Sequence, residues 1–228
     1  MGGGGKAAGF ADRGACPPPG KSIPPPYLVP SPPSTYNPPM RLGKKFFQMP
    51  TADLAKALLG KLLVHGGLSG KIVETEAYLF RGDPACHASR GRTRRNWPMF
   101  AEAGNVYVYL IYGMHLCMNV VSGKVGEGEA VLIRALEPVS GLEEMRENRG
   151  TERAESLCAG PGRLTRALGI TLGHNNTSLI DGELEIHDRG EKPGILSSPR
   201  IGIKEGRELE LRFFVAGSRF VSGGRLVR

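Results

Sequence analysis

Two carboxylates and a phenol stand at alternate positions in one short stretch of the chain, Lys71-Ile72-Val73-Glu74-Thr75-Glu76-Ala77-Tyr78. The close mixing of apolar and polar residues predicts a strand. Side chains alternate between the two faces of a strand, so we expect Glu74, Glu76 and Tyr78 to point the same way. Glutamate is depleted from strands and is costly to bury without a partner. The stretch is therefore either an edge strand with a solvated polar face or a site that uses its carboxylates.

A buried arginine is the natural partner for these carboxylates. Residues 130–136, Ala-Val-Leu-Ile-Arg-Ala-Leu, are too apolar to be anything but a buried strand, and Arg134 stands inside it. Leaving a guanidinium buried without an anion would cost several kcal/mol. We therefore expect Arg134 to pair with Glu74 or Glu76, which would place an ion pair inside the fold.

An aromatic residue is predicted at the tip of a β-hairpin. Residues 106–111 and 116–121 are rich in β-formers, and Tyr112-Gly113-Met114-His115 interrupts them. An aromatic side chain at a hairpin tip has little of its own chain to contact and often serves a partner. The alternative is that Tyr112 folds back onto the core.

Basic residues gather in two segments that could meet phosphates. The polar stretch 81–99 contains His87 and several arginines, among them Arg90, Arg92, Arg94 and Arg95. Loops of this length are usually functional or disordered, and arginines in them either bind phosphate or face solvent. The second segment is a predicted helix start, Gly160-Pro161-Gly162-Arg163. The positive charge of Arg163 in the first turn is unfavourable to the helix dipole, unless an anion binds at this helix end. The net charge of +8 and pI near 9.5 favour an anionic partner such as nucleic acid.

The chain divides into a distinct N-terminal segment and a longer part. The longer part contains the helices and strands that must position these residues. Residues 1–40 are rich in glycine and proline with few large apolar residues, and we expect a disordered tail there. Residues 41–228 suffice for one core. They are predicted to include a helix capped by Thr51, a hairpin from 62–64 and 71–78, a short helix at 141–149, a helix that opens in 158–164 and runs to about residue 168, and strands at 184–186, 200–203 and 209–215.

Several classes of protein are disfavoured by what the chain does not contain. No run approaches eighteen apolar residues, so we expect no membrane span. The four cysteines, Cys16, Cys86, Cys117 and Cys158, form no C-x-x-C pair, so we expect reduced thiols and no zinc site. Only Cys86-His87 and His115-x-Cys117 could begin a metal site, and we expect neither metal nor cofactor.

Taken in order, these segments resemble the alkyladenine (3-methyladenine) DNA glycosylase family of the mammalian type. The resemblance covers roughly residues 41–222, and the collinearity of several blocks makes it specific. The matching blocks are Arg41-Leu42-Gly43, the stretch 72–78, Arg95-Asn96, the stretch 106–109, Tyr112-Gly113-Met114, Cys117-Met118-Asn119, the stretch 134–138, Gly141-Leu142-Glu143 with Met145-Arg146, Gly160-Pro161 and Arg212-Phe213.

The resemblance implies an α+β fold, a single compact mixed α/β domain around an antiparallel sheet, with a protruding β-hairpin that intercalates into DNA. It implies that Glu76 deprotonates the attacking water and that Arg134 helps to hold the water and the carboxylate. Tyr112 is the implied wedge. The implied base pocket is Tyr78, His87, Tyr109 and Asn119, the last of which excludes guanine, and the implied DNA contacts are Arg92, Arg94, Arg95, Met114 and Arg163.

The activity implied is that of a monofunctional DNA glycosylase in base excision repair, acting on duplex DNA with damaged purines: 3-methyladenine, 7-methylguanine and hypoxanthine. Such an enzyme must extrude the base, and stacked aromatic rings favour cationic alkylated bases. We expect hydrolysis without strand cleavage, because no lysine stands out as a Schiff-base nucleophile. We also expect a monomer without a membrane partner, in the nucleus if the source is eukaryotic and in the cytoplasm otherwise.

Two departures from the mammalian pattern put the substrate range in question: His115 stands where another aromatic residue is usual, and Arg163 where lysine is common. Three other functions would use the same residues differently. A nucleic-acid-binding protein that has lost the chemistry needs Tyr112 but not Glu76. A free-nucleoside hydrolase needs the pocket but not Tyr112, and an RNA-specific binder would reject deoxyinosine.

Overall fold

The structure, a computed structural model, describes residues 40–223. Apart from Met40, the predicted tail of residues 1–40 lies outside the described residues, as does Cys16. The strands are β1 (Met40–Arg41), β2 (Leu62–His65), β3 (Leu68–Tyr78), β4 (Val106–Ile111), β5 (His115–Val121), β6 (Ala130–Ser140), β7 (Leu184–Asp188), β8 (Ile195–Ser198) and β9 (Arg212–Val215). The helices are α1 (Lys44–Phe47), α2 (Thr51–Ala57), α3 (Leu142–Arg149), α4 (Ala154–Leu157) and α5 (Pro161–Ala167), with 3₁₀ turns η1 (Trp97–Phe100) and η2 (Leu172–His174).

The strands form one curled antiparallel sheet, which confirms the α+β prediction. The main path runs β1-β7-β2-β3-β6-β5-β4, and β9 joins β3 while β8 joins β9. One edge of β3 is shared, because residues 68–71 pair with β2 and residues 74–76 pair with β9. The opposite edge pairs with β6 along most of its length. Strand β3 is therefore enclosed on both sides, which rules out a solvated edge strand for Glu74 and Glu76.

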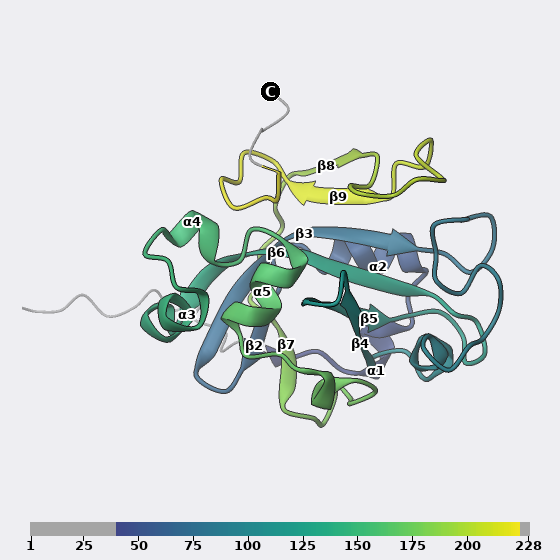
Figure 1. Cartoon of the computed structure of the whole chain (residues 1–228), viewed down its shortest axis with the longest axis horizontal. Coiled ribbons are helices and arrows are strands. Elements are labelled where there is room, and N and C mark those ends of the chain that lie inside the picture. The colour runs from purple at the N-terminus through teal and green to yellow at the C-terminus, as the bar shows by residue number, and fades with distance from the viewer. Residues whose placement is uncertain (1–39, 224–228) are drawn as a thin grey trace, which may run out of the picture. The chain divides into compact units, whose positions relative to one another are not determined.

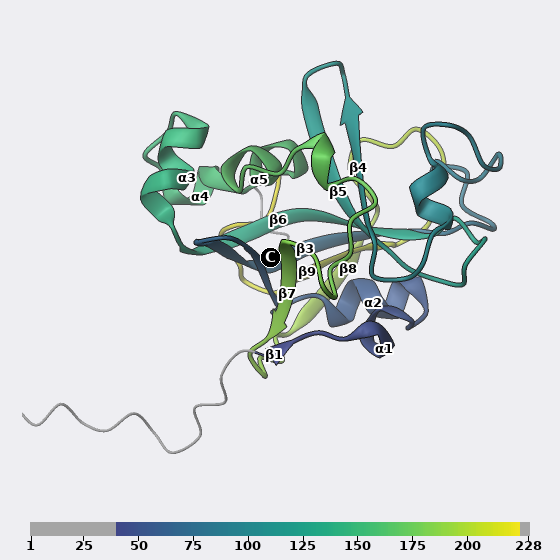
Figure 2. The same ribbon diagram turned by 90° about the horizontal axis from the view of Figure 1, so that it is seen from below.

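Helices cover both faces of the long strands β3 and β6. On one face α2 packs against both strands, and on the other α5 packs against β5 and β6 (Figures 1 and 2). Helix α2 is held by its buried residues Leu54 and Ala55. Thr51 is not the cap predicted from the sequence: Pro50 precedes the helix, and the Thr51 hydroxyl instead bonds Ser122 Oγ at 2.8 Å.

The hairpin of β4 and β5 projects from the body of the domain, as Figure 2 shows most clearly. Its strands pair from Val106 with Val120 to Ile111 with His115. The tip turns through Tyr112 (φ 53°) and Gly113 (φ 71°), two residues with positive φ, as in the tight turns that suit hairpins. A positive φ is strained for a bulky residue such as tyrosine. Backbone strain of this kind concentrates at functional positions, so the tip is a candidate contact.

The C-terminal third differs from the sequence prediction at residues 195–203, where the strand β8 was not predicted. The strand predicted at residues 200–203 is wrong, since these residues form a loop and the strand β8 lies just before it. The Arg200 side chain is committed to Asp83 and to the carbonyl of Ala77, and Gly202 has a φ of 78° that interrupts extended backbone. None of the helices between residues 40 and 223 is long and apolar enough to span a membrane.

Candidate active site

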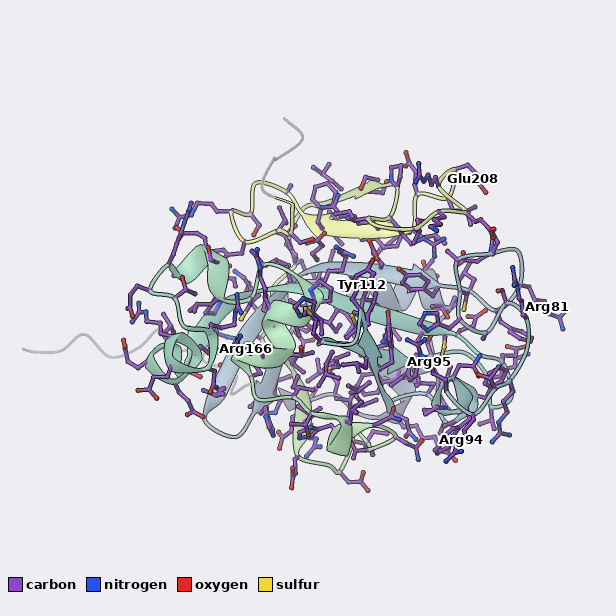
Figure 3. The ribbon with its side chains drawn as sticks, in the orientation of Figure 1. Arg81, Arg94, Arg95, Tyr112, Arg166 and Glu208 are labelled. Atoms are coloured by element: carbon purple, nitrogen blue, oxygen red, sulfur yellow. The ribbon has the colours of Figure 1, made fainter. Side chains whose placement is uncertain are left out.

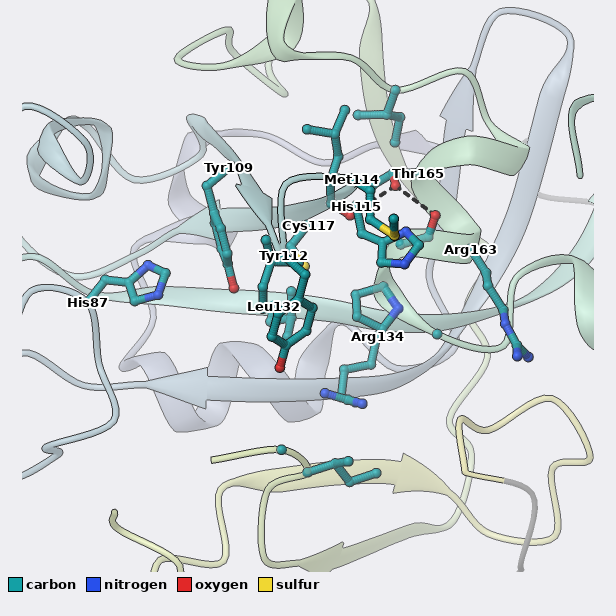
Figure 4. A pocket seen from close by; sticks show the side chains of 18 of the residues that line it. His87, Tyr109, Tyr112, Met114, His115, Cys117, Leu132, Arg134, Arg163 and Thr165 are labelled. Carbon is teal, nitrogen blue, oxygen red and sulfur yellow. Dashed lines mark hydrogen bonds between the residues drawn. The ribbon is translucent and has the colours of Figure 1, made fainter. Parts of the chain in front are cut away.

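A cleft of about 1200 Å³ opens between the hairpin, α5 and the loop that follows β8. Figure 4 shows its two ends: His87 and Tyr109 at one, and Arg163 at the start of α5 at the other. Between them lie Tyr112 and Met114 from the hairpin. Small-molecule sites span roughly 300–1,000 Å³. The cleft is therefore large enough to admit a purine together with part of the sugar-phosphate backbone that carries it.

Glu76 lies one side-chain layer behind the wall of this cleft. Its carboxylate has no exposed surface, and each of its three polar partners lines the cleft. Tyr78 Oη donates to Oε2 at 2.9 Å, Arg134 Nη1 donates to Oε2 at 3.2 Å, and the Ile201 backbone N–H donates to Oε1 at 2.8 Å. A carboxylate has about four acceptor positions, so these bonds leave one on Oε1.

A β-bulge aims Arg134 at the two carboxylates. Thr75 pairs with Ile133 and Glu74 with Ala135, which leaves Arg134 without a partner in the register. An extra residue of this kind re-directs its side chain. Arg134 contacts Glu76 at 3.2 Å and Glu74 at 3.4 Å, which confirms the pairing predicted from burial. Burial alone would lower the pKa of Arg134, but Glu76 and Glu74 more than offset this and the pKa is raised, so the guanidinium stays charged.

Glu74, equally buried, is held by a different set of residues. Arg212 Nε donates to its Oε1 at 2.6 Å. Ser222 donates twice, from its hydroxyl to Oε1 at 2.9 Å and from its N–H to Oε2 at 2.5 Å. Neither Arg212 nor Ser222 lines the cleft. Glu74 therefore fastens β9 and the segment after it to β3.

Aromatic rings wall the end of the cleft beside Glu76. His87 and Tyr109 meet edge to face with centroids 4.6 Å apart, and Tyr107 lies behind them, 5.2 Å from Tyr109. Burial, with Glu76 beside it, raises the pKa of Tyr78, and burial raises the pKa of Tyr107 to about 12, so both remain hydrogen-bond donors. Burial, with Arg95 nearby, lowers the pKa of His87, so this imidazole is neutral at pH 7.

Tyr112 stands at the open side of the cleft with 81% of its surface exposed, which excludes the alternative that it folds back onto the core. Met114 is 72% exposed beside it. In Figure 3, Tyr112 lies near the middle of a face that carries Arg94 and Arg95 on one side and Arg166 on the other. Basic side chains thus flank the exposed phenol.

Comparison with known proteins decides the family. The sequence profile of the family described as Methylpurine-DNA glycosylase (MPG) matches residues 45–219. The chain belongs to this family.

Curated relatives agree with the glycosylase assignment. A protein of Methanoculleus marisnigri is 52% identical over 191 residues, which cover 80% of this chain and 99% of that protein. A protein of Chlorobium phaeobacteroides is 51% identical over 190 residues, which cover 80% of this chain and 96% of that protein. Both carry the provisional name 3-methyladenine DNA glycosylase. The chain is a DNA glycosylase, and DNA is its partner.

Most of the glycosylase residues singled out from the sequence meet at the cleft. Tyr78, His87, Tyr109, Tyr112, Met114, Arg134 and Arg163 line it, and Glu76 touches the wall. Arg92 and Arg94 are exposed away from the lining, and Arg95 covers the Tyr109 ring at 5.5 Å. Asn119 does not reach the lining, because its amide donates to the Tyr107 carbonyl at 3.0 Å and is buried.

Three contributors to the glycosylase cleft escaped sequence reasoning. The Ile201 N–H is a backbone donor, so no residue type in the sequence indicates it. Arg149 and Arg166 also line the cleft, and burial with neighbouring Arg163 and Arg166 lowers the pKa of Arg149. Such a cluster of guanidiniums creates a positive potential that attracts anions. In the sequence, only the distribution of cationic residues along 146–166 could have indicated that Arg149 and Arg166 line the cleft.

The predicted reduced state of the thiols agrees with the structure, where Cys86, Cys117 and Cys158 are free and buried. Neither Cys-His pair forms a metal-ligand cluster within the described part of the glycosylase. One group there, His65, His174 and Glu183, brings ligand atoms within 4.8 Å of one another. However, His174 Nδ1 accepts the Thr171 N–H at 3.0 Å, so Nε2 of the neutral ring carries the hydrogen rather than a lone pair for a metal.

Proposed function

We propose that this glycosylase extrudes 3-methyladenine, 7-methylguanine and hypoxanthine from duplex DNA and hydrolyses their N-glycosidic bonds, leaving abasic sites for base excision repair. One observation carries the proposal: a buried carboxylate, Glu76, is fixed by three groups of the cleft wall and retains an open acceptor position. A water bound at that position would attack the sugar of a nucleotide whose base occupies the aromatic end. We further propose that the protein acts as a monomer without a membrane partner.

Extrusion of the base is the first step. Unstacking and unpairing a nucleotide costs a few kcal/mol, so a group that fills the vacated space offsets part of that cost. Tyr112 is suited to this because it is exposed, projects at the hairpin tip and has a strained backbone. Met114 and Arg163 line the same opening and would contact the flanking DNA, and Arg92, Arg94 and Arg95 would meet phosphates beyond it.

The aromatic end of the cleft is the part that recognises the base. The rings of Tyr78, His87 and Tyr109 stack on any purine and favour cationic, alkylated ones. A neutral His87 adds no repulsive charge to such a base. If the Tyr107 hydroxyl donates to His87 Nδ1, 3.1 Å away, the ring hydrogen lies on Nε2 and is free to bond the lesion. Asn119 would act on guanine only indirectly, by fixing the Tyr107 backbone.

Hydrolysis uses Glu76 as general base. As the glycosidic bond lengthens, positive charge develops at the sugar, and the carboxylate both stabilises that charge and accepts a proton from the attacking water. Arg134 and the Tyr78 hydroxyl keep the carboxylate oriented toward the water. A cationic base leaves without a proton, whereas hypoxanthine needs one from a general acid. No metal or cofactor takes part in these steps.

The proposal is tested with duplexes that each carry one lesion, followed by alkaline cleavage of abasic sites. We expect release of all three bases and strand breaks only after alkali. Borohydride is added in a parallel reaction, because Lys204 lines the cleft and could attack the sugar in place of water. A trapped protein–DNA adduct would contradict hydrolysis. Equal activity on free nucleosides would favour the nucleoside hydrolase, and activity restricted to inosine in RNA would favour the RNA reading.

A further inference from the structure

Two of the three groups that hold Glu76 are themselves attached to one buried residue, Arg200. The guanidinium of Arg200 lies 4.6 Å from the centre of the Tyr78 ring. The peptide that follows Arg200 supplies the Ile201 N–H that bonds Glu76. We propose that Arg200 and Asp83 form a clamp that positions Glu76 for catalysis, so that Arg200 is a positioning residue of the glycosylase reaction. This inference rests on the proposed role of Glu76.

The clamp has the geometry of a fixed attachment point. Arg200 Nη1 and Nη2 each donate to one oxygen of Asp83 at 2.6 Å, and Nη1 also donates to the Ala77 carbonyl at 2.9 Å. Both side chains of the pair are fully buried. A two-pronged contact between planar groups fixes direction as well as distance. Ala77 stands between Glu76 and Tyr78, so the clamp ties the loop to the strand at the position where both side chains originate.

Asp83 is itself fixed by the turn after β3. Its Oδ2 accepts the Leu79 N–H at 3.1 Å, and its Oδ1 accepts the Ala85 N–H at 3.1 Å. Gly206 closes over the pair: a Cβ there would meet Arg200 Nη2 at 3.1 Å and Asp83 Oδ1 at 3.4 Å, and its φ of 67° also favours glycine. The loop between β8 and β9 is irregular, so this attachment replaces the strand pairing it lacks.

The position of Tyr78 shows why the clamp acts on the reaction and not only on stability. Tyr78 lines the cleft, whereas Arg200 is absent from the lining, so the guanidinium covers the side of the ring that faces the interior. The ring cannot retreat while Arg200 is in place, and its hydroxyl remains on Glu76 Oε2. Loss of the clamp would release Tyr78 and the Ile201 N–H together, which leaves Glu76 oriented by Arg134 alone.

The test uses Arg200→Lys and the milder, isosteric Asp83→Asn. Asp188→Asn is the control, because it removes a partly exposed ion pair with the same 2.6 Å contact, to Lys61, and neither residue lines the cleft. Misplacing a catalytic group by about 1 Å can slow a reaction about 100-fold, so we expect single-turnover base release to fall about 10- to 100-fold in both clamp variants. Binding to undamaged duplex should not change, and the control should keep the wild-type rate.

A second readout is independent of activity. Hydrogen exchange of the Ile201 amide, followed by NMR, should speed up in both clamp variants and not in Asp188→Asn. Wild-type base release in folded Arg200→Lys and Asp83→Asn, with Ile201 still protected, would overturn the clamp. If the unaltered protein released no base at all, the proposed function would fail, and the Ile201 exchange would still decide whether Arg200 positions that amide.

Discussion

Glu74 and Glu76 stand two residues apart on β3, are equally buried and share Arg134, yet they face different parts of the molecule. The other partners of Glu74 are Arg212 and Ser222, which belong to the C-terminal segment. The other partners of Glu76 line the cleft. The two positions therefore have the same burial and the same charge. They differ in their partners, since Glu74 bonds the C-terminal segment and Glu76 bonds the cleft wall.

Under the proposed function, one strand carries both a structural carboxylate, Glu74, and a catalytic one, Glu76. Glu74 holds β9 and the segment after it to β3, and together with Glu76 it keeps Arg134 charged. Glu76 then needs only light restraint from three donors, which preserves an acceptor position for water. The same substitution at each site should consequently have separate effects, one on stability and one on rate.

The largest expected effect is that of Glu76→Gln on chemistry. Removing a general base slows a reaction about 10²–10⁴-fold, and glutamine keeps the size and one acceptor of glutamate. Single-turnover release of hypoxanthine should fall within that range, while affinity for lesion-containing duplex is retained. An unchanged rate would show that Glu76 is not the general base.

Glu74→Gln should instead reduce the free energy of unfolding. Arg212 would lose its buried carboxylate and Arg134 one of two, and breaking such a pair costs about 3 kcal/mol or more. Denaturant unfolding measures this loss. Asp188→Asn, which opens a partly exposed pair, is the control and should cost at most about 1 kcal/mol. A Glu74→Gln protein as stable as the control would remove the structural role of Glu74.

Tyr112→Ser should affect only base extrusion from duplex. Tyr112 offsets part of the few kcal/mol that base extrusion costs, so its loss should slow release from duplex DNA about 10-fold. Release from a single-stranded lesion should change little. Val125→Ser removes an apolar side chain with 70% exposure that does not line the cleft, and it should leave both rates unchanged. Equal losses on single and double strands would contradict the wedge.

The smallest expected effect is a pH dependence of stability from His87. Burial lowers its pKa below the ordinary value of 6.5, so the unfolded chain binds this proton more readily than the folded one. The contribution of His87 to stability is therefore present above pH 6.5 and is lost as the pH falls below it. Between pH 7.5 and 5.5 the thermal midpoint should fall further for the wild type than for His87→Gln. Parallel curves would show that His87 does not titrate in this way.

The sequence predicted the parts of the molecule that local pattern controls. Alternation and β-formers predicted β3 and the hairpin, and the burial of Arg134 predicted its pairing with Glu74 and Glu76. Contacts between distant segments were not predictable in this way, because Asp83 and Arg200 are separated by 117 positions and their pairing leaves no periodic signal. The same pairing explains why residues 200–203, apolar enough for a strand, form a loop.

The central claim is that Glu76 controls the rate of base release whereas Glu74 controls stability. One paired measurement tests it most directly. Glu74→Gln and Glu76→Gln are compared on one hypoxanthine duplex, at a temperature where circular dichroism shows both folded. The account predicts that Glu74→Gln releases base at nearly the wild-type rate while Glu76→Gln is slower by about 10²-fold or more. Comparable rates for the two variants, or a faster Glu76→Gln, would contradict it.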